Sequence, residues 1–248
     1  MSGARRVLVG TAGWSVPRAS RPSFPAEGTG LCRYAAVFRA LEINSTFYRP
    51  HQGATFARWA GSVPPGFRFS VKMPRAITHE RGLDNTAPLL DEFLAQIEPL
   101  GSKLGCLLVQ LPPKLELDLA IARRFFKALR SRVETDVALE PRHATWFTEE
   151  AHEMLVRFRV ARVAADPPRG TTGLEPGGWS ELAYFRLHGS PRIYFSSYDD
   201  AYLDALTARL RGLARQGTRC WCIFDNTTLG AATANGLGLV ERLRSRTR

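Results

Sequence analysis

Short apolar segments rich in β-branched residues alternate along the chain with longer segments of helical periodicity. The strand-like segments cover residues 7–13, 41–47, 67–73, 105–111, 137–142, 161–166, 184–188 and 220–225. Apolar residues at helical spacing occur in residues 31–40, 54–62, 87–100, 119–131, 148–159, 200–216 and 231–244. Strands that alternate with helices in this way predict βα units and a parallel sheet.

Eight strands in 248 residues fit the size of a (β/α)8 barrel. We therefore expect an α/β fold with a single TIM-type barrel domain over residues 1–248. Residues 167–181, between the sixth and seventh strands, are rich in glycine and predict a loop-like crossover, which makes the barrel slightly irregular. Because strand order cannot be read from one sequence, a doubly wound open sheet is the alternative.

Polar residues stand near the C-terminal ends of the second to eighth strands. Side chains two positions apart share one face of a strand, so several of these residues fall on the same side. In a parallel barrel the strand ends converge on one mouth, where the βα loops build the active site. The residues that we expect there include Glu42, Asn44, Lys72, Gln110, Glu140, Arg142, Asp166, Arg186, His188, Asp225 and Asn226.

Charged side chains at this mouth need a compensating partner, because an unpaired buried charge costs several kcal/mol. One interpretation is a closed ion-pair network, in which Lys72 and Arg186 pair with Glu42 and Glu140. The other is a ligand site, in which Lys72 and Arg186 hold a phosphate or carboxylate and arginine binds it in a bidentate way. The sequence leaves both interpretations open.

The composition is that of a globular protein and excludes disordered, collagen-like and disulfide-rich classes, with 44% hydrophobic, 23% charged and 10% aromatic residues. The formal net charge is +11, and residues 1–90 hold eleven arginines and one lysine against four acids. This basic part fits an anionic partner, either a small molecule or a nucleic acid backbone. Thirty arginines against four lysines also fit a genome rich in arginine codons.

No apolar segment approaches the roughly 18–20 residues of a membrane helix, so we expect no membrane partner. The four cysteines lack the spacing of a disulfide framework, and three of them, Cys106, Cys220 and Cys222, lie in strand-like segments. Cys220 and Cys222 are best explained by core packing. Reduced thiols predict a cytoplasmic protein.

A series of motifs extends from Val7 to about Leu239. Its members are GTAGW at 10–14, EINSTFY at 42–48, FRFSVK at 67–72, ITH at 77–79, QLPP at 110–113, EPRH at 140–143 and RLHG at 186–189. Together they resemble the YecE-like family, domain of unknown function 72, which implies a TIM-type barrel and no settled reaction. Where the family pattern commonly reads Phe-Asn-Asn, this chain has Phe224-Asp225-Asn226. An acid at position 225 suits a base, an ion-pair partner or a metal ligand.

The residues at the mouth predict acid–base chemistry on a small phosphorylated or carboxylated substrate, without an organic cofactor. The candidate catalytic residues are Glu42, Glu140, Asp166, His188 and Asp225, with Glu140 or Asp225 as base and His188 as acid. The candidate substrate-binding residues are Trp14, Asn44, Tyr48, Lys72, His79, Gln110, Arg142, Trp146, Arg186 and Asn226. Among them, the aromatic residues either stack on a flat or sugar-like ligand or cap the barrel core.

Three alternatives remain open from the sequence. The first is a divalent metal held by Glu140, Asp166, His188 and Asp225, although neighbouring arginines would repel a cation. The second is a nucleic-acid-binding or nuclease-like barrel whose exposed arginines grip phosphates, including Arg18, Arg21, Arg49 and Arg58. The third is a scaffold whose polar mouth is only an ion-pair network.

Overall fold

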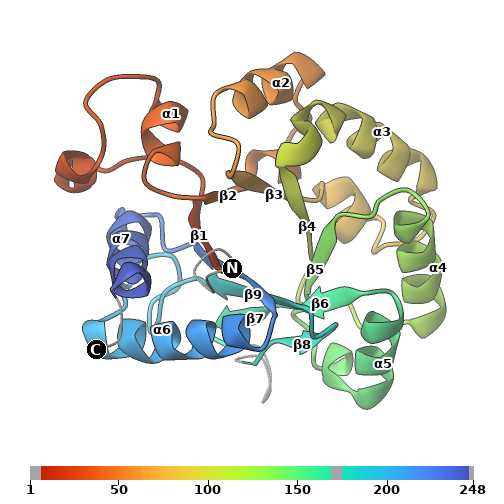
Figure 1. The fold of residues 1–248 in the computed structure, drawn as a ribbon. Coiled ribbons are helices and arrows are strands. Elements are labelled where there is room, and N and C mark those ends of the chain that lie inside the picture. The colour runs from red at the N-terminus through yellow and green to blue at the C-terminus, as the bar shows by residue number, and fades with distance from the viewer. Residues whose placement is uncertain (1–6, 169–174, 246–248) are drawn as a thin grey trace.

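Residues 7–168 and 175–245 are described by the computed structural model, and their strands form one curved sheet inside a ring of helices (Figure 1). The strands are β1 (Val7–Ala12), β2 (Ala40–Ile43), β3 (Arg68–Lys72), β4 (Leu104–Gln110), β5 (Asp136–Glu140), β6 (Val160–Arg162), β7 (Ala164–Asp166), β8 (Gly177–Gly178), β9 (Leu182–Leu187) and β10 (Arg219–Phe224). Their order in the sheet is β7-β9-β10-β1-β2-β3-β4-β5-β6-β8. Only the short pairing of β6 with β8 is antiparallel among the described strands.

Residues 160–166, which we call the seam, bring the two sides of the sheet together. On one side β6 pairs with β5, with Val160 opposite Val137. On the other side β7 pairs with β9, with Ala165 opposite Arg186. Only Val163 separates β6 from β7. These pairings produce a nearly closed barrel and confirm the predicted α/β barrel, with the predicted sixth strand divided into two short halves.

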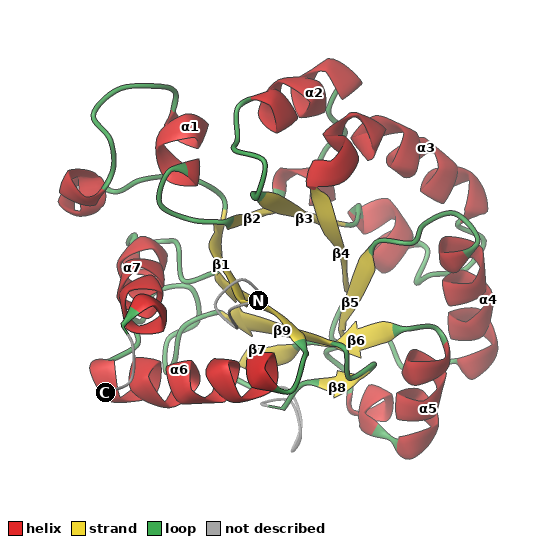
Figure 2. Cartoon of the chain, in the orientation of Figure 1, coloured by secondary structure: helices red, strands yellow, loops and turns green. Residues whose placement is uncertain are grey.

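Seven α-helices surround the sheet in the described part of the chain (Figure 2). They are α1 (Gly30–Ala35), α2 (Gly53–Gly61), α3 (Ala87–Ile97), α4 (Leu119–Arg130), α5 (Glu149–Arg157), α6 (Asp200–Arg215) and α7 (Ala231–Arg244). Shorter elements are the 3₁₀-helices Arg18–Ser23, Ser45–Phe47, Glu98–Lys103 and Ala144–Phe147 and the π-helix Ala76–Glu80. Polar caps begin four of the helices, because Thr29, Asp118, Thr148 and Asp199 accept hydrogen bonds from first-turn N–H groups.

The crossover from β7 to β9 has no helix in its described residues, 167–168 and 175–181, which agrees with the predicted loop. Residues 169–174 of that prediction lie outside the described residues. No described helix has the length and apolar character needed to cross a membrane.

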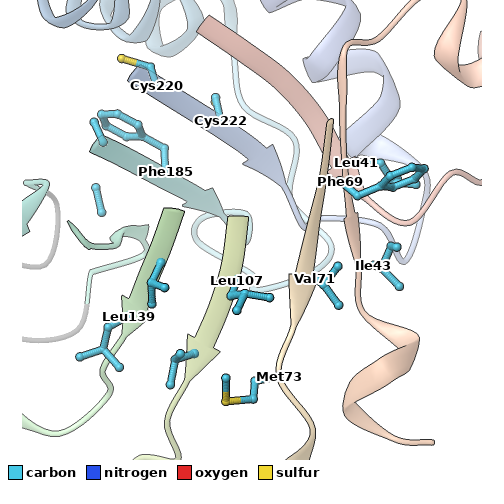
Figure 3. Packing of buried hydrophobic residues seen from close by; sticks show 14 of the residues in the cluster. Leu41, Ile43, Phe69, Val71, Met73, Leu107, Leu139, Phe185, Cys220 and Cys222 are labelled. Atoms are coloured by element: carbon cyan, nitrogen blue, oxygen red, sulfur yellow. The ribbon is translucent and has the colours of Figure 1, made fainter. Parts of the chain in front are cut away.

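Two apolar layers fill the molecule, because successive strand side chains point to opposite faces of the sheet. The outer layer lies between the sheet and the helices and includes Leu41, Val71, Leu139 and both Cys220 and Cys222, as Figure 3 shows. The inner layer is a separate cluster inside the barrel, formed by Ala40, Cys106, Leu108, Ala138, Ala161, Val163, Ala165, Leu182, Tyr184, Trp221 and Ile223. The inner layer fills the barrel next to the polar strand ends, so these polar side chains pack against an apolar layer.

Several predicted boundaries are wrong by a few residues. The second strand ends at Ile43 rather than at residue 47, because Ser45–Phe47 turns into a 3₁₀-helix in which the Phe47 N–H donates to the Asn44 carbonyl at 3.1 Å. The helix expected at residues 31–40 ends at Ala35, since Ala40 already pairs with Gly10 of β1. In both places tertiary pairing overrides the local periodicity.

Candidate active site at the mouth of the barrel

Arg186 lies at the centre of the polar strand ends and is 1% exposed. Its Nε and Nη2 donate to both carboxylate oxygens of Glu42, with the shortest distance 2.6 Å. Its Nη1 donates to Glu140 Oε2 at 2.6 Å and to Gln110 Oε1 at 3.1 Å. Its Nη2 also donates to Asp225 Oδ2 at 3.1 Å. All five N–H groups of the guanidinium therefore have protein acceptors, and the geometry favours the pairing interpretation for Arg186.

Glu42 also contacts Tyr184, which in turn contacts Ser70, and the sequence analysis did not single out either residue. The Tyr184 hydroxyl donates to Glu42 Oε2 at 2.8 Å and lies 2.8 Å from Ser70 Oγ. The Tyr184 ring stacks on Trp221 of the inner apolar layer, with centroids 5.8 Å apart. Tyr184 stands two residues before Arg186 on the same strand face, so the alternation rule could have identified it.

His188 bridges two carboxylates. Its Nδ1 lies 3.0 Å from Asp225 Oδ2, and its Nε2 lies 3.2 Å from Glu140 Oε1. Burial opposes the charge on His188, but the two carboxylates raise its pKa above the ordinary value. Burial likewise opposes ionisation of Glu140 and Asp225, but Arg186 and His188 hold the pKa of both carboxyl groups below the ordinary value. Ionised carboxylates only accept hydrogen bonds, so both ring nitrogens donate and His188 is an imidazolium.

We call Glu42, Glu140, Arg186, His188 and Asp225 the charge cluster. They come from β2, β5, β9 and the residues that follow β9 and β10, so strands far apart in sequence build one site. Of the roles that the sequence leaves open for the acid at position 225, the contacts of Asp225 are those of an ion-pair partner.

Two further cations border the charge cluster. Arg142 donates from Nε and Nη2 to Glu140 Oε1, at 3.2 and 3.1 Å, and its side chain is 15% exposed. Burial opposes the charge on Arg142, but Glu140 and the Tyr194 hydroxyl raise its pKa above the ordinary value, and Tyr194 packs edge-on against His188 with ring centroids 5.8 Å apart. Lys72, the last residue of β3, places Nζ 4.0 Å from the centroid of the Phe47 ring.

His79 lies beside these cations, in the π-helix that follows β3. Its ring packs against Phe47 with centroids 4.8 Å apart. Burial, followed by the positive charges of Lys72 and Arg142, lowers the pKa of His79 to about 4. The imidazole is therefore neutral near pH 7, unlike that of His188.

Asp166 does not join the other candidate catalytic residues. Its neighbour Ala165 faces the inside of the barrel, so the Asp166 side chain points to the opposite side of the sheet. There the Tyr198 hydroxyl donates to the Asp166 backbone carbonyl at 3.2 Å, and burial together with the Asp166 carboxyl group raises the pKa of Tyr198 and Tyr202. The four residues of the metal alternative therefore do not converge. Within the described residues no group of three or more His, Cys, Asp or Glu side chains has the arrangement of a metal site.

Two candidate binding residues are buried in structural roles. Trp146 is 1% exposed, packs in the outer apolar layer and donates from its indole N–H to the Leu115 carbonyl at 3.0 Å, so it does not wall the mouth. Asn226 is fully buried, and its amide donates to the Ser196 carbonyl and to Asn235 Oδ1. It fixes the loops after β9 and β10 to the start of α7.

The other candidates surround the mouth. Trp14 and Asn44 line a cavity of about 560 Å³ between the ends of β1 and β2 and the start of α7, and Trp14 packs edge-on against Trp59. Tyr48 is 74% exposed and packs edge-on against Phe47. These aromatic side chains are open to a ligand, in contrast to Trp146.

Comparison with known proteins gives one consistent family. The model of a family described as protein of unknown function DUF72 matches residues 8–248. The UPF0759 protein YunF of Bacillus subtilis is 23% identical over 96% of this chain and 94% of its own length. The UPF0759 protein YecE of Escherichia coli is 29% identical over 59% of this chain and 52% of its own length.

Solved structures give the same answer. A DUF72 family protein from Thermotoga maritima has a TM-score of 0.79 and 28% identity, with 96% of this chain and 99% of that chain covered. A DUF72 family protein from Enterococcus faecalis has a TM-score of 0.81 and 20% identity, with 98% and 97% covered, and this second likeness concerns the fold alone. The chain, with its charge cluster at one end of a nearly closed α/β barrel, belongs to the DUF72 family.

Proposed function

We propose that the mouth of the barrel binds a small anionic substrate and acts on it by acid–base chemistry, without an organic cofactor. The observation that carries the proposal is the charge balance around Arg186. The cations are Lys72, Arg142, Arg186 and the His188 imidazolium, and the carboxylates are Glu42, Glu140 and Asp225. One positive charge is left unbalanced in a nearly buried site, and an anion would neutralise it.

The proposed roles follow from which groups are already engaged. Arg186 has no free N–H, so it positions the carboxylates and does not bind the substrate. Arg142 and Lys72 supply the anion-binding charge at the opening. His188 is the acid, because it is already protonated, and Glu140 is the base that recovers the proton, since its Oε1 lies 3.2 Å from Nε2.

The test is a thermal-shift panel of organic acids, sugar phosphates and nucleotides on the full chain. A ligand at 100 times its Kd should stabilise the protein by about 2.7 kcal/mol, which raises Tm by roughly 5–11 °C for a domain of this size. Arg142→Met should remove the shift. The matched control is Arg58→Met, because Arg58 is exposed on α2 and far from β5 in the sheet order. An unchanged shift in Arg142→Met would contradict the proposal.

A second candidate, a polyanion such as single-stranded nucleic acid, rests on one observation. Arg18 and Arg21 are exposed on the segment that follows β1, and Arg49 is exposed on the segment that follows β2, next in sequence to the exposed Tyr48. Cationic side chains with an exposed aromatic ring are typical of single-strand binding. Oligonucleotide affinity that falls steeply with salt, and that drops in a triple Arg→Ala variant at these positions, would favour this candidate over the small anion.

A further inference from the structure

Lys72 is placed differently from every other cation of the mouth. It is 7% exposed, and Thr46 fixes its backbone by donating from Oγ1 to the Lys72 carbonyl at 2.6 Å. Arg186 and Arg142 both donate to carboxylates. The Lys72 ammonium has no hydrogen bond or ion pair with any residue that the structure describes, and it lies over the face of the Phe47 ring. A buried ammonium without an acceptor is unusual, because its desolvation is left uncompensated.

The surroundings of Lys72 make its neutral amine more accessible than that of an exposed lysine. Burial, followed by the positive charge of Arg186, lowers the pKa of Lys72 to about 8, and the carboxylates offset this only in part. The charged groups that act on Lys72 are Glu42, Glu140, Arg186 and Asp225, and the nearby His79 is influenced by both Lys72 and Arg142. Desolvation next to another cation is one of the recognised ways in which proteins activate a lysine as a nucleophile. At pH 7 roughly a tenth of the Lys72 side chains would be unprotonated.

We infer that Lys72 is a nucleophile that forms an imine with the carbonyl carbon of a 2-oxo acid. The inference rests on the proposed function, and it names the substrate class of the same site. A 2-oxo acid fits because it carries its anion one bond away from its carbonyl group. Arg142 donates two of its five N–H groups to Glu140 and lies near the Tyr194 hydroxyl, which leaves at least two donors for the substrate carboxylate.

The step balances without an oxidant or a reductant. The Lys72 ammonium loses a proton to solvent, and the amine nitrogen attacks the carbonyl carbon. The carbonyl π pair moves to oxygen, which takes a proton from His188 to give a carbinolamine. After the attack the nitrogen carries two protons and loses one of them to the imidazole of His188, which restores the imidazolium. The hydroxyl takes from solvent a proton equal to the one that the ammonium released, and it leaves as water while the nitrogen lone pair forms the C=N bond. The products are a protonated imine and one water molecule. The imine draws electrons from the adjacent carbon, which prepares the substrate for proton removal by a base of the site.

The full chain itself supplies the control for a trapping experiment, because its only other lysines are Lys103, Lys114 and Lys127. The protein is incubated with pyruvate or 2-oxoglutarate and sodium cyanoborohydride, digested, and analysed by peptide mass spectrometry. We expect the reduced adduct on Lys72 at a rate at least about tenfold above the other three lysines, since a tenfold difference follows from a one-unit difference in pKa between amines. The rate at Lys72 should level off above pH 8, whereas the rates at exposed lysines continue to rise.

Lactate and 2-hydroxyglutarate separate this inference from the proposed function. They carry the same carboxylates but no carbonyl, so they bind without forming an imine. Lys72→Arg keeps the positive charge but has no primary amine, so it should lose the adduct. A hydroxy-acid shift without preferential labelling of Lys72 by the oxo acids would overturn the inference and leave the proposed function standing. If neither class of acid raises the Tm, and Lys72 is labelled no faster than Lys114, the results refute both the imine at Lys72 and the binding of these acids at the mouth.

Discussion

Replacement of Arg186 by methionine tests most directly whether the ion pairs of Arg186 stabilise the charge cluster. Methionine keeps much of the side-chain volume and removes the guanidinium. Glu140 would still contact Arg142 and His188, and Asp225 would still contact His188. Glu42 would retain only the Tyr184 hydroxyl. One fully buried carboxylate therefore loses its counter-charge.

Breaking a buried ion pair on one side costs about 3–5 kcal/mol. For a domain of this size that corresponds to a fall in Tm of roughly 6–20 °C, at about 2–4 °C per kcal/mol. Urea unfolding at pH 7, followed by circular dichroism, gives the free energy directly. The double variant Arg186→Met/Glu42→Gln removes the orphaned charge as well, and the cycle with both single variants should give a coupling energy of about 0.5–3 kcal/mol.

The control is Arg58→Met, since exposed substitutions usually stay within about 0.5 kcal/mol. If Arg186→Met lost less than about 1 kcal/mol, or if the double variant were no more stable than Arg186→Met, Glu42 would not depend on Arg186 and the reasoning would be refuted.

Four other substitutions test separate features of the structure. Because the pKa of His188 is raised, its stabilising contribution is complete below the unfolded value of about 6.5 and is lost as the pH rises through the folded pKa. The difference in unfolding free energy between wild type and His188→Gln should therefore shrink toward high pH, and a constant difference in urea titrations from pH 5 to 9 would count against the imidazolium. Gly10→Ala should lower the free energy of unfolding by about 1–3 kcal/mol, because a Cβ at this position would lie 2.1 Å from the Ala40 carbonyl oxygen. On helix α6, a Cβ at Gly212 would meet no atom within 4 Å, so Gly212→Ala should instead raise the free energy of unfolding by about 0.4–1 kcal/mol. Thermal unfolding of both variants measures these changes. Asp118→Ala removes the cap of α4, which accepts from two N–H groups, and should lower stability by about 1 kcal/mol, whereas an unchanged midpoint would show that the cap is not needed.

The alternation of polar and apolar residues was enough to predict the barrel and most of the mouth. Glu42, Glu140 and Arg186 were placed together because parallel strand ends meet on one side. The sequence could not decide between pairing and ligand binding for Arg186, since its contact with Glu42 joins residues 144 positions apart. That contact depends on the register of β2 and β9, which are not neighbours in the sheet.

The errors also have physical causes. Asp166 was grouped with the mouth from its place at a strand end, but side-chain alternation turns it toward Tyr198 and Tyr202. Trp146 was expected beside a ligand because it follows the fifth strand, yet a short 3₁₀-helix turns its ring into the outer apolar layer. Tyr194 was missed because the loop that brings it to His188 has no periodicity to analyse.

The seam has a mechanical consequence for the charge cluster. Most strands are bonded to a neighbour on each side, whereas β7 is bonded to β9 only, and β6 is bonded to β5 and, over two residue pairs, to β8. Glu140 on β5 and Arg186 on β9 stand on opposite sides of this weak line, and their 2.6 Å ion pair spans it from within. The same contact that joins Glu140 and Arg186 in the charge cluster thus also holds the two sides of the seam together. A ligand that draws Glu140 away from Arg186 would also weaken the barrel at the seam. Ligand binding at the mouth and local opening of the seam would therefore be thermodynamically linked.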